Sequence, residues 1–127
     1  MTFKEAEELY AEARHKSGGK PLDNNTRLHK RTVKKVTEYD QYAIQLHGTD
    51  VVTMSLSRDG TTDYTIDSGE WHTVTTKQRI NKYVPNIRLY TVKGIMKVAY
   101  GWDGTSYMGE ALFKDGMVFN HEGIYQL

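Results

Sequence analysis

The chain of 127 residues contains no cysteine, which excludes disulfide bridges, thiolate zinc sites and cysteine nucleophiles. It also has no run of about 18 apolar residues, so we expect no membrane-spanning helix and no membrane partner. The N-terminal segment is acidic, and its charged and apolar residues alternate too often for it to be a signal peptide. The length is typical of one domain that folds without a disulfide or metal. We therefore expect a single cytoplasmic domain (1–127).

Signatures of catalysis are also missing. The chain has no Gly-x-Ser-x-Gly elbow, no Walker loop and no glycine-rich dinucleotide fingerprint. His47 and His72 lie near carboxylates in the sequence, but no His-x-His or His-Glu-x-x-His spacing occurs. Most aspartates belong to Asp-Gly turns or strand ends. We predict no catalytic residues, no metal site and no cofactor, and hence a protein that is not an enzyme.

The net charge is small, but the charges are distributed unevenly. The formal net charge is +1. Residues 14–35 carry eight Lys or Arg and one Asp, and residues 71–100 carry six Lys or Arg and no acid. Residues 36–70, between them, carry seven acids and one Arg. The basic segments either pair with the acidic one or gather on one face, and only the second arrangement makes an anion-binding surface.

An amphipathic helix is predicted at the N-terminus, within residues 1–19. Thr2 and Glu5 have the Thr-x-x-Glu spacing of a capping box. Apolar residues then recur at three- and four-residue steps and form one stripe. Ser17-Gly18-Gly19 is expected to end the helix, because glycine adopts the left-handed conformation of a C-terminal cap.

The hydrophobic period changes after a polar loop predicted at 20–25. Residues 26–36 mix basic residues with Thr and Val, which is typical of an exposed strand. Two further strands alternate apolar and polar residues around Ile44 and Met54. Arg58-Asp59-Gly60 indicates a hairpin turn into a fourth strand. These elements predict an antiparallel meander.

A short helix is expected to begin at Thr75 or Thr76. It should end before Pro85, because proline disfavours helical geometry at the preceding residue. Two strands follow within residues 87–100, and Asp-Gly turns mark a final aromatic hairpin over 101–127. The predicted fold is α+β, with an N-terminal helix, an antiparallel sheet of six to eight strands, and one short helix packed on the sheet.

Two segments of the chain resemble a known family. They are LHGTDVVTM at residues 46–54 and, after an Asp-Gly turn, SGEWHTVTTKQRIN at 68–81. They are similar to the LHxTxVVT and SGGWxTxTTKxRIN core of small bacteriophage and mobile-element proteins, with Glu70 replacing the second glycine. The resemblance implies a phage-type protein with a family-like core at 26–100. Because such proteins often end soon after the region of Tyr90, it also implies that 101–127 is an appendage.

The first candidate site is the start of the short helix. Thr75, Thr76 and Lys77 would bring backbone N–H groups, two hydroxyls and an ammonium together, as a phosphate site requires, and Arg79 lies one turn on. The alternative is that a threonine merely caps the helix and that Lys77 is solvated.

The second candidate site is the basic strand within residues 26–36. Arg31 and Lys35 share one parity of this strand, so their charges would lie on one face and extend a phosphate path. The alternative is a solvated edge strand, where Lys and Arg discourage association between sheets.

Trp71 is either a stacking platform or a large core residue, and we expect it to be buried and structural.

These observations predict a non-catalytic phage accessory protein that binds an anionic ligand, either nucleic acid or a nucleotide. The predicted binding residues are Thr75, Thr76, Lys77, Arg79, Arg31 and Lys35. Two alternatives stay open. One is a protein-binding inhibitor of a host factor, such as a defence system, that would use the aromatic hairpin of 101–127. The other is a small nucleotide hydrolase. The oligomeric state does not follow from the sequence.

Overall fold

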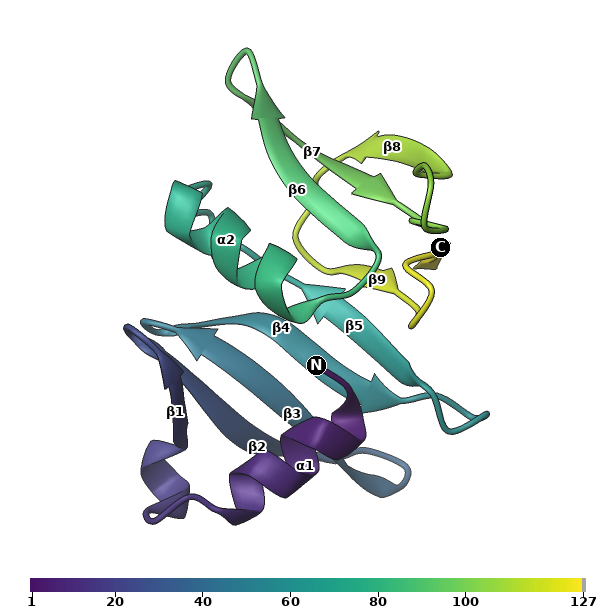
Figure 1. Cartoon of the computed structure of the whole chain (residues 1–127). Coiled ribbons are helices and arrows are strands. Elements are labelled where there is room, and N and C mark those ends of the chain that lie inside the picture. The colour runs from purple at the N-terminus through teal and green to yellow at the C-terminus, as the bar shows by residue number, and fades with distance from the viewer. Residues whose placement is uncertain (127) are drawn as a thin grey trace.

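The computed structural model describes residues 1–126 (Figure 1). Its largest part is a seven-stranded antiparallel sheet in the order β1-β2-β3-β4-β5-β9-β10. The strands are β1 (Lys20–Asp23), β2 (Thr26–Lys34), β3 (Glu38–Leu46), β4 (Thr49–Leu56), β5 (Thr62–Ile66), β9 (Met117–Phe119) and β10 (Tyr125–Gln126). Because β2 to β5 pair in sequence order, the predicted meander is confirmed.

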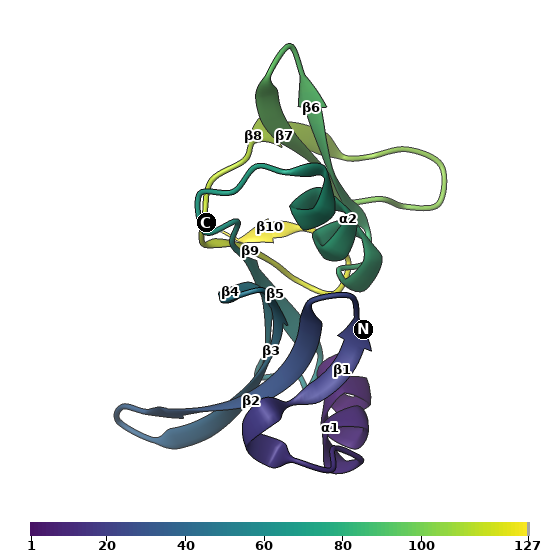
Figure 2. The ribbon, with the colours of Figure 1, turned by 90° about the vertical axis from the view of Figure 1, so that its left-hand side faces the viewer.

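A second, smaller sheet has the order β6-β7-β8. Its strands are β6 (Ile87–Val92), β7 (Ile95–Tyr100) and β8 (Gly109–Leu112), and its helical neighbour is α2 (Val74–Tyr83). The two perpendicular views place α2 between the two sheets (Figures 1 and 2), where it contacts both β4 and β6. The predicted α+β class is therefore confirmed, and the second sheet is a feature that the sequence pattern did not indicate.

Helix α1 (Phe3–Ala11) packs on the main sheet. Thr2 and Glu5 form the predicted capping box, and the ring of Phe3 meets that of Tyr42 edge-on at 5.1 Å between centroids. The prediction of a helix that extends to the glycines at 18 and 19 is wrong. The helix ends at Ala11, and a 3₁₀ turn, η1 (Lys16–Gly18), follows.

The end of α1 is capped by a side chain from the following turn. The Lys16 ammonium turns back and donates hydrogen bonds to the carbonyls of Tyr10 at 2.7 Å and Ala11 at 2.9 Å. The last carbonyls of a helix have no partner four residues on, and a cation there also suits the dipole. The Tyr10 carbonyl accepts in addition from the N–H of Ala13 at 3.0 Å. The predicted polar loop at 20–25 is likewise wrong over Lys20–Asp23, which forms edge strand β1. An edge strand accommodates Pro21 because one of its sides needs no N–H donor.

The C-terminal segment is not the predicted hairpin. Strand β8 pairs with β7 in the small sheet, whereas β9 pairs with β5 in the main sheet. The Lys114-Asp115-Gly116 turn thus carries the chain from one sheet to the other. Phe113, Met117 and Phe119 are buried there and belong to the same core cluster as α1 and β2–β5.

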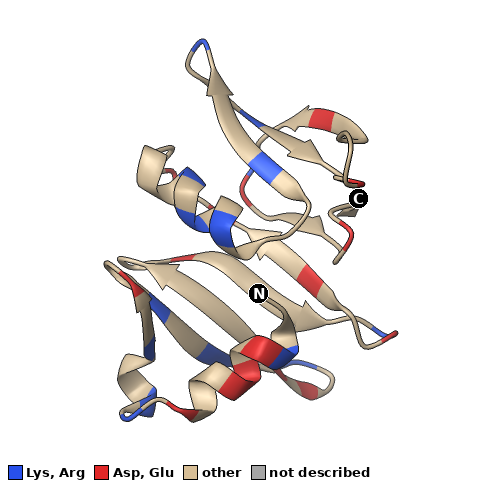
Figure 3. Ribbon diagram, in the orientation of Figure 1, with Lys and Arg blue, Asp and Glu red and all other residues tan. Residues whose placement is uncertain are grey.

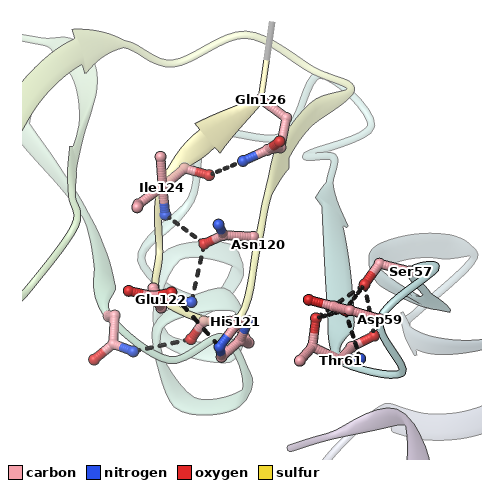
Figure 4. A network of polar contacts seen from close by, with 9 residues as sticks. Ser57, Asp59, Thr61, Asn120, His121, Glu122, Ile124 and Gln126 are labelled. Carbon is pink, nitrogen blue, oxygen red and sulfur yellow. Dashed lines mark hydrogen bonds and ion pairs between the residues drawn. The ribbon is translucent and has the colours of Figure 1, made fainter.

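Two turns on the main sheet are held by single polar side chains (Figure 4). In the predicted turn between β4 and β5, the Asp59 carboxylate accepts hydrogen bonds from the Ser57 and Thr61 hydroxyls and from the Thr61 N–H. These bonds, the one from Ser57 first, lower the pKa of Asp59. Between β9 and β10, the Asn120 side-chain oxygen accepts from the N–H groups of Glu122 and Ile124, both at 2.9 Å.

Candidate functional site

A hollow of about 590 Å³ lies between the β3–β4 turn and the start of α2. We call it the Trp71 pocket. Its lining residues are Leu46, His47, Gly48, Thr49, Val51, Ser68, Trp71, Thr73, Thr75 and Thr76. The lining thus combines an apolar floor with five hydroxyl groups, one imidazole and one indole, and includes no Lys, Arg, Asp or Glu.

The β3–β4 turn forms the first wall. Leu46 and Thr49 are paired across the turn, and Leu46 and Val51 are buried in the core. Between them His47 adopts a left-handed φ of 54°, which is uncommon for a residue other than glycine. Its N–H donates to the carbonyl of Asn25 at 2.8 Å, so the β1–β2 turn fixes this wall.

The loop before α2 forms the second wall. Ser68 is 1% exposed, and both its N–H and its hydroxyl donate to the Asp115 carboxylate at 2.8 Å. Gly69 has a φ of 59°, and a Cβ on it would lie 2.5 Å from the Thr49 hydroxyl oxygen. Only glycine fits this close approach between the two walls. Glu70 has a φ of 71°. This left-handed conformation is one that glycine adopts readily.

Helix α2 begins one or two residues earlier than predicted, at Val74, with Thr73 as N-cap. The Thr73 hydroxyl oxygen accepts from the N–H of Thr76 at 3.1 Å and lies 3.0 Å from the Thr76 hydroxyl. As at any helix start, the N–H groups of Val74 and Thr75 have no intrahelical acceptor. Thr75 is exposed and Thr76 is buried at the pocket wall.

Trp71 is not the core residue that we predicted. Its side chain is 68% exposed, and it lines the pocket beside the cap of α2. The prediction failed because the loop before α2 is anchored by Ser68 and Gly69 instead, which leaves the indole free to face solvent.

Lys77 and Arg79 lie on α2 but outside the pocket lining. The Lys77 ammonium donates to the Thr91 hydroxyl on β6 at 2.6 Å. The Arg79 side chain is largely buried, donates to the Thr26 hydroxyl at 2.9 Å and lies 3.8 Å from the Asp23 carboxylate. A hydrogen bond from Lys82 is the main cause of the lowered pKa of Asp23. Lys77 and Arg79 thus connect α2 to the two sheets.

Arg31 and Lys35 are not brought to the start of α2. Arg31 makes two hydrogen bonds to the Asp50 carboxylate, at 3.1 and 2.9 Å, which raise the pKa of its guanidinium. Lys35 is exposed in the β2–β3 turn. Strand β2 has nine residues, so its two ends are roughly 26 Å apart at about 3.3 Å per residue. Lys35 is therefore far from Thr26, where Arg79 lies, and the predicted single path is not assembled.

No three His, Asp or Glu side chains within residues 1–126 are grouped so as to hold a metal ion. Among the helices of this described part, none has the length and apolar character needed to cross a bilayer. The His72 ring packs edge-on against Phe113 at 5.6 Å, on the side of the loop toward the small sheet.

The comparison with known families adds the origin of the chain. A model of the Kyanoviridae Gp96 protein matches residues 13–120. The chain belongs to this bacteriophage protein family. The matched region contains both walls of the Trp71 pocket and strands β8 and β9, so it begins before residue 26 and continues past residue 100. No curated protein and no solved structure matches the chain.

The sequence indicated one wall of the pocket and missed its partner. The helix-start pattern predicts Thr75 and Thr76 as binding residues, and both line the pocket. No pattern predicts His47 and Thr49 as binding residues. The signal that pointed to them was the resemblance, because every lining residue falls within 46–54 or 68–81.

Proposed function

We propose that this protein is a non-catalytic phage accessory protein that binds a nucleotide, or the end of a nucleic-acid strand, in the Trp71 pocket. It would do so in the cytoplasm of the infected cell. The observation that carries the proposal is the exposed Trp71 indole beside the capped start of α2, over a hollow of about 590 Å³. The ligand's base would stack on the indole, and its phosphate would lie at the helix start.

The helix start supplies the phosphate end of the proposed site. The N–H groups of Val74 and Thr75 point out of the first turn, and the positive end of the helix dipole favours an anion there. The hydroxyls of Thr73 and Thr75 are further donors within the lining. Because no carboxylate lines the pocket, nothing in the lining repels a phosphate. Lys77 and Arg79 would contribute to the local positive potential, with α2 carrying no acid.

The indole supplies the base end of the site. Aromatic side chains in soluble proteins are usually covered, and an exposed one beside a hollow suits stacking of a planar ring. Base stacking on an aromatic side chain contributes about 1–3 kcal/mol per base and tolerates any base. This chemistry favours a nucleotide over inorganic phosphate alone.

Binding rather than turnover is proposed because the lining offers no acid–base pair. Its only titratable side chain is the His47 imidazole. Hydrolysis of a phosphate ester generally needs a metal or a positioned carboxylate to activate water.

The test is a titration of the protein with mononucleotides and short single-stranded oligonucleotides at low salt. We expect saturable binding that is weakened by Trp71→Ala by a factor of about 5–150, the equivalent of about 1–3 kcal/mol. Trp102→Ala is the matched control, because Trp102 is also partly exposed but lies on another loop. Absence of binding to every nucleotide and oligonucleotide would refute the proposal. Equal losses of affinity in the two variants would refute the assignment of binding to the Trp71 pocket. Release of a hydrolysis product would show that the protein is a hydrolase and not a binding protein.

A second candidate function is supported by the surface around β8. Several large apolar side chains are exposed on the small sheet and on the loop before β8, namely Val92, Ile95, Trp102, Tyr107, Met108 and Leu112. The Trp102 and Tyr107 rings lie 4.9 Å apart, and Asp103 fixes their loop by accepting from the N–H groups of Thr105 and Ser106. The Trp102–Tyr107 pair and the exposed Met108 next to it give this loop the apolar character of a protein-binding surface, which favours a host-protein inhibitor.

This second function predicts a salt-tolerant complex with one host protein, which would be recovered from infected-cell extract. A Trp102→Ala/Tyr107→Ala variant should lose that complex, whereas Trp71→Ala should retain it. If the complex is lost with Trp71→Ala and kept in the double variant, the Trp71 pocket contacts the partner instead.

A further inference from the structure

A second hollow, also of about 590 Å³, lies between the end of α1 and strand β1. Its chemistry differs from that of the Trp71 pocket, because Arg14, Lys20 and Arg27 line it together with His15, and Glu12 is the one acid of its lining. We call it the basic hollow. Figure 3 shows Lys and Arg on the loop after α1 and on the neighbouring strands, with the acids of α1 beside them.

The two arginines of the basic hollow lack the ion-pair partners that some other cations of the protein have. Arg31, Arg79 and Lys82 each have an aspartate within 4.0 Å. Within residues 1–126, neither Arg14 nor Arg27 makes such an ion pair. Arg27 donates one hydrogen bond, to the carbonyl of Gly18 at 3.3 Å, which leaves most of its donors free.

Lys20 is only weakly neutralised. Its ammonium lies 4.0 Å from the Glu12 carboxylate, whose side chain is 63% exposed. Such an exposed, long ion pair contributes little and is readily exchanged for a better anion. The lining of the hollow therefore contains three cationic side chains and only one carboxylate, which is solvated.

The walls of the basic hollow are fixed. On one side, the Lys16 ammonium binds the end of α1, while the Tyr10 hydroxyl donates to the Lys16 carbonyl at 2.9 Å. On the other, Gly19 has a φ of 75°, and a Cβ on it would lie 2.6 Å from the Leu28 carbonyl oxygen. The loop is thus pressed against β2, and the cations project from a backbone that needs little ordering when a ligand binds.

We propose that the basic hollow is a phosphate-binding site, with Arg14 and Arg27 as the principal contacts and Lys20 as a third. A guanidinium group binds phosphate oxygens through two parallel hydrogen bonds, and the lining contains two of them without an ion-pair partner among the described residues. The phosphate belongs either to a nucleic-acid backbone or to a small phosphorylated molecule. Its lining shares no residue with that of the Trp71 pocket.

The test uses the isotope-labelled full-length protein and two probes, inorganic pyrophosphate and a single-stranded DNA of twelve nucleotides. We expect pyrophosphate to shift the amide resonances of residues 12–27. Arg14→Gln/Arg27→Gln should abolish those shifts and should lower the salt slope of DNA binding by about 1.4, at about 0.7 for each phosphate contact to a single strand. The matched control, Arg58→Gln/Arg88→Gln, removes the same charge from exposed positions elsewhere and should change neither.

The outcomes separate the sources of the phosphate. Much tighter binding of DNA than of pyrophosphate assigns the site to a nucleic-acid backbone, and comparable binding assigns it to a small phosphorylated molecule. The proposal is overturned if neither probe shifts residues 12–27, or if the control pair causes the same loss as Arg14→Gln/Arg27→Gln. Trp71→Ala leaves the pyrophosphate shifts in place if the two sites are independent, so failure of the Trp71 pocket and failure of the basic hollow are distinguishable.

Discussion

The strands before residue 67 and the strands after residue 101 are built in different ways. Strands β2, β3 and β4 each pair with the next strand along the chain, through short turns. Strands β8 and β9 are near in sequence but join different sheets, and β9 pairs with β5. Local pairing follows from the alternation of apolar and polar residues and from the turn residues. The pairing of β9 depends instead on which edge strand of the folded meander is free to accept another strand.

The difference also shows in where the apolar side chains go. In the segment after residue 101, Phe119 is fully buried, while Leu112 is 57% exposed. Both residues belong to short strands, of four residues in β8 and three in β9. Their fates differ because β9 lies against the core of the main sheet and β8 lies at the edge of the small one.

Removal of residues 101–127 should have the largest effect. The truncation deletes buried Phe113, Met117 and Phe119 and uncovers β5. We expect a chain that is unfolded or insoluble, as measured by circular dichroism and size-exclusion chromatography. A truncated chain that unfolds cooperatively would show that this segment is an appendage, as the sequence suggested.

Phe119→Ala should give the next largest effect, a loss of about 3–5 kcal/mol in the free energy of unfolding, because it leaves a cavity in the core. Leu112→Ala is the control and should change the free energy by less than about 0.5 kcal/mol. Chemical denaturation measures both. Equal losses would mean that β8 and β9 contribute alike, and the comparison between them would fail.

Asp115→Ala should lower the free energy of unfolding by about 1–3 kcal/mol, because it leaves the buried N–H and hydroxyl of Ser68 without their acceptor. Asp115→Asn retains an acceptor oxygen and should lose less. A double-mutant cycle with Ser68→Ala gives the coupling energy. A coupling near zero would show that the crossover turn is not held by this contact.

The Asp59 turn predicts a smaller, pH-dependent effect within the meander. The lowered pKa of Asp59 means that its contribution to stability is present above its ordinary pKa of 3.8 and is lost as the pH falls through the folded value. Urea unfolding should therefore show wild type and Asp59→Asn converging below about pH 4. If the difference in stability between wild type and Asp59→Asn stays constant as the pH falls below about 4, the role given to the Asp59 carboxylate is wrong.

Trp71→Ala should have the smallest effect on folding, within about 0.5 kcal/mol, because the side chain is exposed. Thermal unfolding of the variant measures this directly. A loss of several kcal/mol would return Trp71 to the structural role predicted from the sequence and would remove the main support for the Trp71 pocket.

Particular residues show how far sequence reasoning reached into the site. The capping box at Thr2 and Glu5, the turn at Asp59 and the end of α2 before Pro85 follow from contacts within a few residues, and all were predictable. Thr75 and Thr76 were predictable as a helix start. Their neighbours across the pocket, His47 and Thr49, were not, because they are set by the β3–β4 turn and by the close approach of Gly69.

The sequence by itself thus determined the local elements of this protein: the first helix, the meander, the short helix and the hairpin of β6 and β7. The tertiary structure alone decided that β8 and β9 separate, that Trp71 faces solvent, and that Arg31 and Lys35 lie away from Lys77 and Arg79. The physical reason is the range of the interactions. Turns, caps and alternation act over a few residues, whereas burial of a strand, exposure of an indole and pairing of a charge depend on surfaces that exist only after the chain has folded.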